Sequence, residues 1–222
     1  MRGERDDGAA IGVVCALAAE LGVLRSGATR TRALGIELGE LDVDGVRVVT
    51  CVAGVGKVHA ASGASALVAA GATRALLVVG TCGGLRQSLA PGTLVHCTTA
   101  VEVDFARGRA APSDAAAPLR AVWERVAPGA SGWFLTADRP VLSLWRRLRL
   151  ARAFAGPCVA DMETAAVARV AQRAGVPWAG LRAVTDRATW AGAFSFHQHF
   201  PAQAGRAADS VPALVRALAR ST

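Results

Sequence analysis

Two apolar runs in the last third of the chain each end in carboxylates, and this feature constrains the fold more than any other. The first run leads into Asp161 and Glu163, and the second, residues 178–184, leads into Asp186. The small residues between the two runs have a helical pattern, which Gly175 ends. In open α/β sheets, ligands bind outside the carboxyl ends of the strands. We therefore predict an α/β fold in which these acids lie at a binding site.

The length and composition predict one globular domain. The chain has 222 residues, of which 52% are hydrophobic and 19% are charged, and chains of this size commonly form a single core. We expect residues 1–9 to be a disordered tail and residues 10–222 to form the domain. The formal charge is +8, but the basic residues are spread along the chain apart from one cluster, at Arg146, Arg147, Arg149 and Arg152. Without interleaved aromatic residues, this charge favours a solvated face over a nucleic-acid partner.

The five cysteines are single residues in apolar or glycine-rich runs, without the spacing of a zinc site or a redox pair. They predict small buried thiols in a reducing compartment. The first ten residues lack the layout of a signal peptide, and no apolar run is long and pure enough to cross a bilayer. His197 and His199 would diverge on a helix, which argues against a metal site. We therefore expect a soluble, cytoplasmic protein without a membrane partner, a metal or a cofactor.

Other segments have the patterns of strands and helices. Residues 11–17 have the composition of a buried strand, and residues 32–44 and 45–53 alternate like a hairpin around an Asp-Gly turn. The final amphipathic stretch, about residues 202–219, predicts a helix that covers the sheet.

Two glycine-rich turns follow apolar strands. Residues 76–79 lead into GTCGGL at residues 80–85, where glycine lets the backbone approach a ligand closely, although a simple tight turn has the same pattern. Residues 53–61 (AGVGKVHAA) permit a turn and a helix N-terminus, which is a natural site for an anion or a hydroxyl group. Lys57 could bind an anion there, but a structural role at the helix start is favoured. Glu20, taken alone, is typical of the first turn of a helix.

The acidic segments carry a resemblance to a known family. The sequences DMETAA at residues 161–166 and LRAVTD at residues 181–186 resemble the nucleoside phosphorylase/nucleosidase superfamily, and within it most closely the methylthioadenosine/S-adenosylhomocysteine nucleosidases. The resemblance extends over roughly residues 11–218, and its motifs are specific as a set rather than singly. It implies a single-domain, three-layer α/β/α fold with a central mixed β-sheet flanked by helices, and a homodimer.

The resemblance assigns catalytic roles to two carboxylates. Cleavage of an N-glycosidic bond passes through an oxocarbenium-like state, so the base needs a proton and the sugar needs a nucleophile, which is the two-carboxylate logic of glycoside hydrolysis. Asp186 matches the family's general acid, which protonates N7 of a purine, and burial at a strand end would raise its pKa for that task. Glu20 matches the residue that orients the attacking water, and Ala18 and Ala19 replace the acidic residues that precede it in the family.

The same resemblance predicts the residues that bind the nucleoside. Glu163 would accept hydrogen bonds from the ribose 2' and 3' hydroxyl groups, and Met162 would pack under the sugar. The further binding residues that it implies are Thr81 and Gly83 beside the ribose and the nucleophile, Val141 in the segment that wraps the base, and Phe196 near the 5' end. We expect Asp161 to be structural and Asp138 to hold the neighbouring loop in place.

Three departures from the family affect the substrate. Val78 stands where the phosphorylases carry an arginine for phosphate, and an apolar residue cannot form the charge-assisted pairs that phosphate requires, which favours water as the nucleophile. Residues 101–117 are shorter than the family's lid, which leaves the 5' substituent open. Pro140 replaces an aromatic residue beside the base and has no N–H to donate. Trp145, Trp190 and Phe194 are candidate replacements for stacking, although a core or surface role is favoured for each.

We therefore predict hydrolysis of a purine nucleoside, such as methylthioadenosine or S-adenosylhomocysteine, with a small-molecule nucleoside as the partner. Three alternatives remain. The substrate could be a specialised nucleoside of the futalosine or adenosylhopane type, the reaction could be phosphorolysis, or the chain could be a nucleoside-binding protein without catalysis. The presence of Glu20, Glu163 and Asp186 argues against the last.

Overall fold

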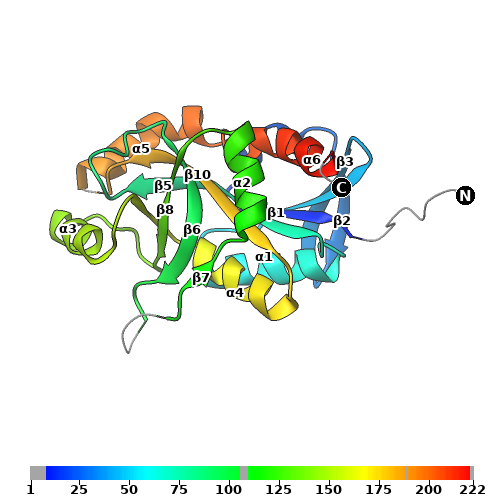
Figure 1. Cartoon of the computed structure of the whole chain (residues 1–222), viewed down its shortest axis with the longest axis horizontal. Helices are drawn as coiled ribbons and strands as arrows, with labels where there is room; N and C mark the ends of the chain where they lie inside the picture. The colour runs from blue at the N-terminus through cyan, green and yellow to red at the C-terminus, as the bar shows by residue number, and fades with distance from the viewer. Residues whose placement is uncertain (1–8, 106–109, 189, 221–222) are drawn as a thin grey trace, which may run out of the picture.

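The computed structural model describes residues 9–105, 110–188 and 190–220, without the side chains of residues 190–195. Nearly all of the expected N-terminal tail, residues 1–9, lies outside the described part of the chain. The described residues form a mixed β-sheet with helices on both sides, which confirms the predicted fold class (Figure 1).

The described sheet has ten strands, in the order β10-β6-β8-β9-β5-β1-β4-β3-β2, with β7 paired to β6. The strands are β1 (Ile11–Cys15), β2 (Thr29–Ala33), β3 (Ile36–Val43), β4 (Val46–Val52), β5 (Ala75–Gly84), β6 (Leu94–Glu102), β7 (Ser113–Asp114), β8 (Ala130–Thr136), β9 (Cys158–Asp161) and β10 (Trp178–Asp186). Strand β10 pairs with both β6 and β5, so β5, β9, β8, β6 and β10 close into a ring. The sequence predicted the mixed sheet but not this closure.

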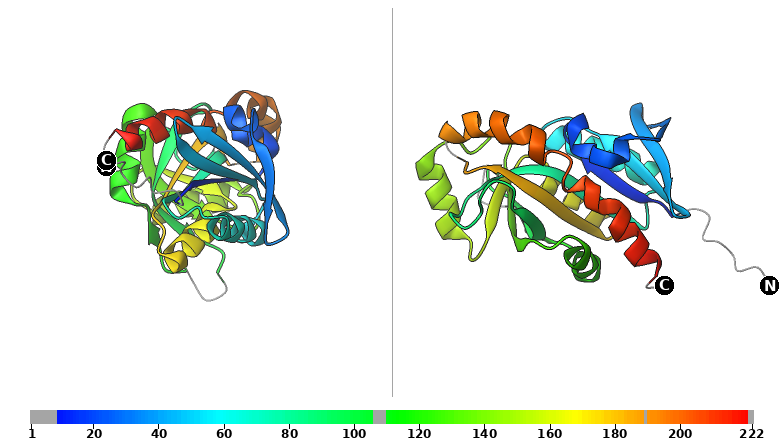
Figure 2. Two further views of the ribbon diagram at one scale, coloured as in Figure 1. Left: turned by 90° about the vertical axis from the view of Figure 1, so that its right-hand side faces the viewer. Right: turned by 90° about the horizontal axis from the view of Figure 1, so that it is seen from above.

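Helices cover both faces of the sheet. They are α1 (Lys57–Ala69), α2 (Ala117–Val126), α3 (Leu144–Ala153), α4 (Thr164–Ala174), α5 (Trp190–Gln203) and α6 (Val211–Ala219), together with the 3-10 helices η1 (Ala18–Arg25) and η2 (Ala208–Ser210). Figure 1 shows α1 and α4 side by side on one face of the sheet. In Figure 2, α5 and α6 follow one another across the opposite face, over β10.

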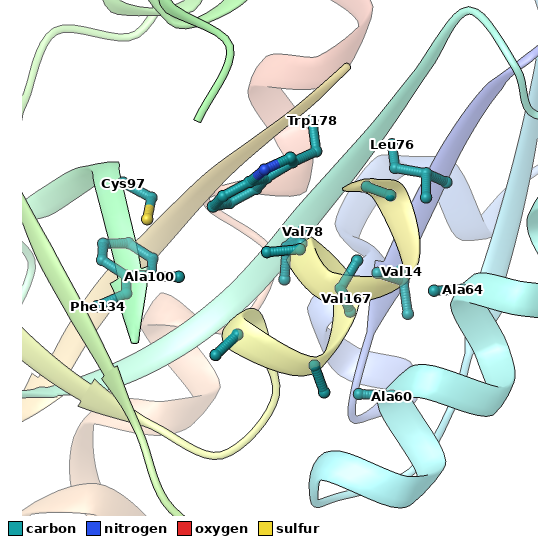
Figure 3. Close-up of a cluster of buried hydrophobic side chains, with 14 of the residues drawn as sticks. Val14, Ala60, Ala64, Leu76, Val78, Cys97, Ala100, Phe134, Val167 and Trp178 are labelled. Carbon is teal, nitrogen blue, oxygen red and sulfur yellow. The ribbon is translucent and has the colours of Figure 1, made fainter. Parts of the chain in front are cut away.

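Strand β5 shows why the fold has three layers. Its residues are buried on both faces, and successive side chains of a strand point to opposite sides. Leu76 and Val78 belong to the cluster that packs against α1 and α4, which includes Val167 (Figure 3). Leu77 and Val79 belong to the cluster on the other face, with residues of α2 and α6. A continuous apolar run therefore serves two cores at once, as is typical of strands covered by helices on both faces.

The predicted hairpin is present as β3 and β4, which pair in antiparallel register. Its turn residues, Asp44 and Gly45, have φ values of 53° and 83°, and a two-residue hairpin turn with positive φ at both positions matches the twist of the strands. Strand β2 adds a further antiparallel strand to β3, which the sequence did not predict.

The single C-terminal helix predicted for residues 202–219 was wrong. That region contains the end of α5, the short helix η2 and then α6. The chain bends at Gly205, where an added Cβ would lie 2.8 Å from the Cα of Gly22, so this break lets two backbones touch. The predicted covering role of the last segment is confirmed, because Leu214 of α6 is buried in the core on the face that α2 and α6 cover.

All five cysteines are free and buried, as predicted. Among the described residues, no helix combines the length and apolar character of a membrane span. Within the same residues, no group of His, Cys, Asp or Glu side chains is arranged to hold a metal ion.

Candidate active site

A cavity of about 370 Å³ lies where the carboxyl ends of several strands meet, which is a suitable size for a small ligand. All eight predicted site residues line it: Glu20, Thr81, Gly83, Val141, Met162, Glu163, Asp186 and Phe196. The structure therefore brings together residues that are up to 176 positions apart in the chain, from Glu20 to Phe196.

Strand pairing accounts for this convergence. Strand β5 lies parallel to β1 on one side and to β10 on the other, so η1, the end of β5 and Asp186 share one edge of the sheet. Strand β9 approaches β5 in antiparallel register, with Gly83 opposite Ala160. This pairing brings the segment after β9, which contains Met162 and Glu163, to the same edge.

Glu20 is buried, with 2% of its surface exposed, and its carboxylate accepts four hydrogen bonds. Oε2 accepts from the backbone N–H groups of Ala16 at 3.1 Å and Leu17 at 3.0 Å. Oε1 accepts from the N–H of Thr81 at 2.9 Å and from its hydroxyl group at 2.8 Å. The absence of a side chain at Gly80 makes room, because a Cβ there would lie 2.9 Å from Oε1. These contacts fix the orientation of the carboxylate that lines the cavity.

Asp186 is held at the end of β10 by two hydrogen bonds. Its Oδ1 atom accepts from the N–H of Ala188 at 2.6 Å, and Oδ2 accepts from the hydroxyl group of Thr185 at 2.9 Å. Burial raises the pKa of Asp186 above its usual value, and these two hydrogen bonds only partly offset it. A carboxyl group with a raised pKa in a cavity is suited to donate a proton.

Glu163 lies at the start of α4 and is tied to two other segments. Its Oε1 atom accepts from the N–H of Gly56 at 3.0 Å, and Oε2 lies 3.0 Å from Nη2 of Arg182. Burial raises the pKa of Glu163, and the nearby guanidinium opposes this effect. Because a carboxylate has about four lone-pair positions, it can accept further hydrogen bonds from a ligand.

Arg182 is a site residue to which the sequence analysis gave no role. Its side chain is 2% exposed, and Nε lies 3.1 Å from Oδ2 of Asp161. Its Nη1 atom donates to the carbonyl group of Thr81 at 2.8 Å. A charged residue inside the apolar run 178–184 was the available signal, because fully buried arginines are almost always paired.

Asp161 has the structural role that we predicted. Its carboxylate accepts hydrogen bonds from the hydroxyl groups of Thr136, at 2.6 Å, and Thr164. Together with Arg182, it ties β8, β9, α4 and β10 to one another beneath the cavity. Asp161 also lines part of that cavity.

The remaining candidates occupy different places. Trp145 is 70% exposed on α3, beside the guanidinium of Arg149, which confirms a surface role. The side chains of Trp190 and Phe194 lie outside the described residues, as do residues 106–109 of the expected short lid. Val78 lies in the hydrophobic core shown in Figure 3 and is absent from the described lining of the cavity.

Comparison with a protein-family model agrees with the arrangement of the carboxylates in the cavity. The sequence model of the phosphorylase superfamily matches residues 10–220, almost the whole chain. The chain belongs to the phosphorylase superfamily. The resemblance inferred from the acidic motifs is thereby confirmed.

Similar members of the phosphorylase superfamily include two curated 5'-methylthioadenosine/S-adenosylhomocysteine nucleosidases. The protein from Geobacillus kaustophilus is 29% identical over 225 residues, which cover 90% of this chain and 93% of the relative. The protein from Actinobacillus succinogenes is 27% identical over 220 residues, which cover 90% of this chain and 96% of the relative.

Solved structures show the same superfamily fold. The S-adenosylhomocysteine nucleosidase from Streptococcus pyogenes, in complex with 5-methylthiotubericidin, superimposes with a TM-score of 0.87 at 24% identity, covering 96% of this chain and 98% of that one. The futalosine hydrolase of Helicobacter pylori gives a TM-score of 0.86 at 22% identity, covering 96% of this chain and 99% of that one.

Proposed function

We propose that this protein hydrolyses the N-glycosidic bond of a purine nucleoside, with a 5'-modified adenosine such as methylthioadenosine or S-adenosylhomocysteine as the substrate. The observation that carries the proposal is that Glu20, Glu163 and Asp186 line one cavity, each with a different hydrogen-bond environment. The similarity to curated nucleosidases over most of the chain supports the same reaction class.

The residues divide the reaction between them. Asp186 donates a proton to the leaving base, because its raised pKa keeps the carboxyl group protonated to higher pH than usual. Glu20 orients the attacking water, whose O–H takes the acceptor position on Oε1 that the rotatable hydroxyl group of Thr81 otherwise fills, since the other three positions hold backbone N–H groups. Glu163 binds the ribose hydroxyl groups, and Arg182 holds Glu163 in place.

Binding of the nucleoside uses the rest of the cavity wall. Met162 packs under the sugar, and Thr81 and Gly83 allow the end of β5 to approach the ribose. The described lining at the base end includes Pro140, Val141 and Leu142 from the loop after β8. These apolar groups suit the faces of a purine ring. Phe196 lies on α5 and would cover the 5' substituent.

Water is favoured over phosphate as the nucleophile. Arg182 is the one arginine in the described lining of the cavity, and its guanidinium is already paired with Asp161 and Glu163. A phosphate ion would need charge-assisted hydrogen bonds of its own, and Val78 supplies none.

Futalosine is the second candidate substrate. The solved futalosine hydrolase covers the chain as fully as the nucleosidases do, although at 22% identity this likeness concerns the fold. Both candidates share the same bond cleavage and differ in the 5' substituent.

A homodimer and a cytoplasmic location are parts of the proposal. Leu17 and Val55 line the cavity and yet are 36% and 46% exposed, and Val58, three residues after Val55, is 77% exposed. An apolar rim of this kind marks a surface that a second copy could cover. Light scattering of the purified protein tests the dimer.

The proposed cytoplasmic location is supported by the cysteines. Five free thiols are in keeping with a reducing compartment.

The direct test is chromatography of the protein incubated with methylthioadenosine, S-adenosylhomocysteine, adenosine, inosine and futalosine, each with and without phosphate. We expect adenine to be released from the first two without phosphate. Release only in the presence of phosphate would contradict hydrolysis. Failure to cleave any of the five would leave a nucleoside-binding role, which equilibrium dialysis with methylthioadenosine would detect.

A further inference from the structure

A cluster of charges beside the cavity takes no part in the mechanism above. Lys57, the only lysine in the chain, begins α1 and faces three carboxylates. Its Nζ atom lies 2.9 Å from Oδ1 of Asp104, 3.2 Å from Oε2 of Glu102 and 3.2 Å from Oδ2 of Asp138. The side chains of Lys57, Glu102 and Asp104 are 17%, 19% and 23% exposed, so water screens the pairs among them less than it would on an open surface. The side chain of Asp138 is 62% exposed, so water screens its pair with Lys57 most, and the loop is held there also by the backbone N–H of Asp138.

The cluster joins three segments that are distant in sequence. Glu102 ends β6, Asp104 follows that strand, and Asp138 belongs to the loop between β8 and α3. Asp104 makes a second connection, since its Oδ2 atom accepts from the backbone N–H of Asp138 at 2.7 Å. Burial by itself lowers the pKa of Lys57, but its bonds to Asp104, Asp138 and Glu102 outweigh burial and raise it above its usual value.

Each end of this arrangement leads to the cavity. On one side, Lys57 follows Gly56, whose N–H holds Oε1 of Glu163. On the other side, Asp138 is two residues before Pro140, the first of three consecutive loop residues that line the cavity. The loop is also anchored where the N–H of Ala137 donates to the carbonyl group of Asp161 at 3.0 Å.

We propose that Lys57 is a positioning residue that fixes the base-side loop, residues 137–143, against the turn that holds Glu163. The inference rests on the proposed nucleosidase function. One cation stands between three anions, so without it the carboxylates would repel one another and Asp138 would move away. Pro140, Val141 and Leu142 would then shift relative to the ribose site. Lys57 does not itself contact the nucleoside in this scheme.

The test compares Lys57→Met, which keeps the length of the side chain without its charge, with Lys57→Arg, which keeps the charge. For Lys57→Met we expect kcat/KM for methylthioadenosine to fall by about tenfold to a hundredfold, mostly through a higher KM, because small misplacements of binding groups cost this much. Lys57→Arg should recover at least half of that loss on a logarithmic scale. The dissociation constant for adenine should rise in parallel with KM.

A matched control separates positioning from general stability. Arg47 on β4 pairs with Glu40, with Nε 2.7 Å from Oε1, and lies outside the described lining of the cavity. Arg47→Met likewise replaces a paired cation by methionine, here one with a single carboxylate partner, and should change kcat/KM less than about twofold, because such partly exposed pairs contribute little. Equal kinetic losses in both variants, or an unchanged KM in Lys57→Met, would overturn the inference.

If Lys57→Met does not fold, NMR of the wild-type protein tests the proposal instead. Protein labelled with carbon-13 at the lysine Cε atom alone gives one side-chain signal in NMR, because the chain has a single lysine. Adenine should shift this signal at the same dissociation constant that calorimetry gives. Binding of adenine without any shift would contradict a link between Lys57 and the base-side loop. If the wild-type protein neither cleaves nor binds a nucleoside, the proposed function fails instead.

Discussion

The Nη2 atom of Arg182 lies 3.0 Å from Oε2 of Glu163, and both side chains are almost completely buried. The same guanidinium reaches Asp161 through Nε at 3.1 Å. The buried guanidinium of Arg182 is thus paired both with Glu163, which is assigned to the ribose, and with Asp161, which joins β9 to its neighbours. Binding geometry and stability therefore depend on the same residue.

Substituting Arg182→Met should destabilise the protein strongly. It leaves two carboxylates buried without their cation, and breaking a buried pair in this way costs about 3–5 kcal/mol of the free energy of unfolding. Denaturant unfolding at pH 7 measures the change. The control is Arg216→Met, which removes an exposed pair with Asp44 and should cost less than about 1 kcal/mol. Similar losses in both variants would contradict the assignment.

Glu20→Gln should impair both turnover and stability. Four donors surround the carboxylate, and an amide nitrogen cannot accept a hydrogen bond from any of them. We expect a loss of about 1–3 kcal/mol in the free energy of unfolding, as for unsatisfied buried donors. Turnover should fall by about a hundredfold to ten-thousandfold, since water is no longer activated. The control is Glu37→Gln, on the exposed hairpin. If turnover fell as far in Glu37→Gln as in Glu20→Gln, the role assigned to Glu20 would be contradicted.

Asp186→Asn should abolish proton donation while preserving the fold. The amide oxygen can still accept the hydrogen bond from the N–H of Ala188. We expect turnover to fall by about a hundredfold to ten-thousandfold, the range for a lost general acid. The dissociation constant for methylthioadenosine, measured by calorimetry, should change much less. Asp114→Asn is the matched control, because Asp114 is exposed and pairs with Thr99. Wild-type turnover in Asp186→Asn would refute the mechanism.

The pH dependence follows from the raised pKa of Asp186. Only the protonated form donates a proton, so kcat/KM should fall as pH rises through that pKa, which burial raises above the usual 3.8. The folded state holds this proton more tightly than the unfolded chain. The contribution of Asp186 to the free energy of unfolding is therefore retained below 3.8 and is lost as pH rises from 3.8 to the raised value. Asp186→Asn should flatten this part of the stability profile, and an unchanged profile in calorimetric unfolding from pH 3 to pH 8 would contradict the assignment.

Much of the site could be predicted from the sequence because its motifs are local. Asp161 to Glu163 and Asp186 each follow an apolar run, and strand ends place such residues at one edge of a sheet. The roles of Glu20 and Thr81 came from the family resemblance, and the hydrogen bond between them could not be foreseen, since it joins residues 61 positions apart. The C-terminal helix was predicted as one piece because the bend at Gly205 depends on contact with the distant Gly22.

The sequence by itself determined the alternation of strands and helices, the hairpin turn at Asp44 and Gly45, and the identity of the acidic residues at the strand ends. These features follow from periodicity and backbone preference, which act over a few neighbouring residues. Only the tertiary structure decided that the sheet closes through β10 and that Arg182 pairs with both Asp161 and Glu163. The same is true of the ion pairs of Lys57 with three carboxylates. Charge pairing and strand closure depend on which distant segments meet, and that outcome is settled by packing of the whole core.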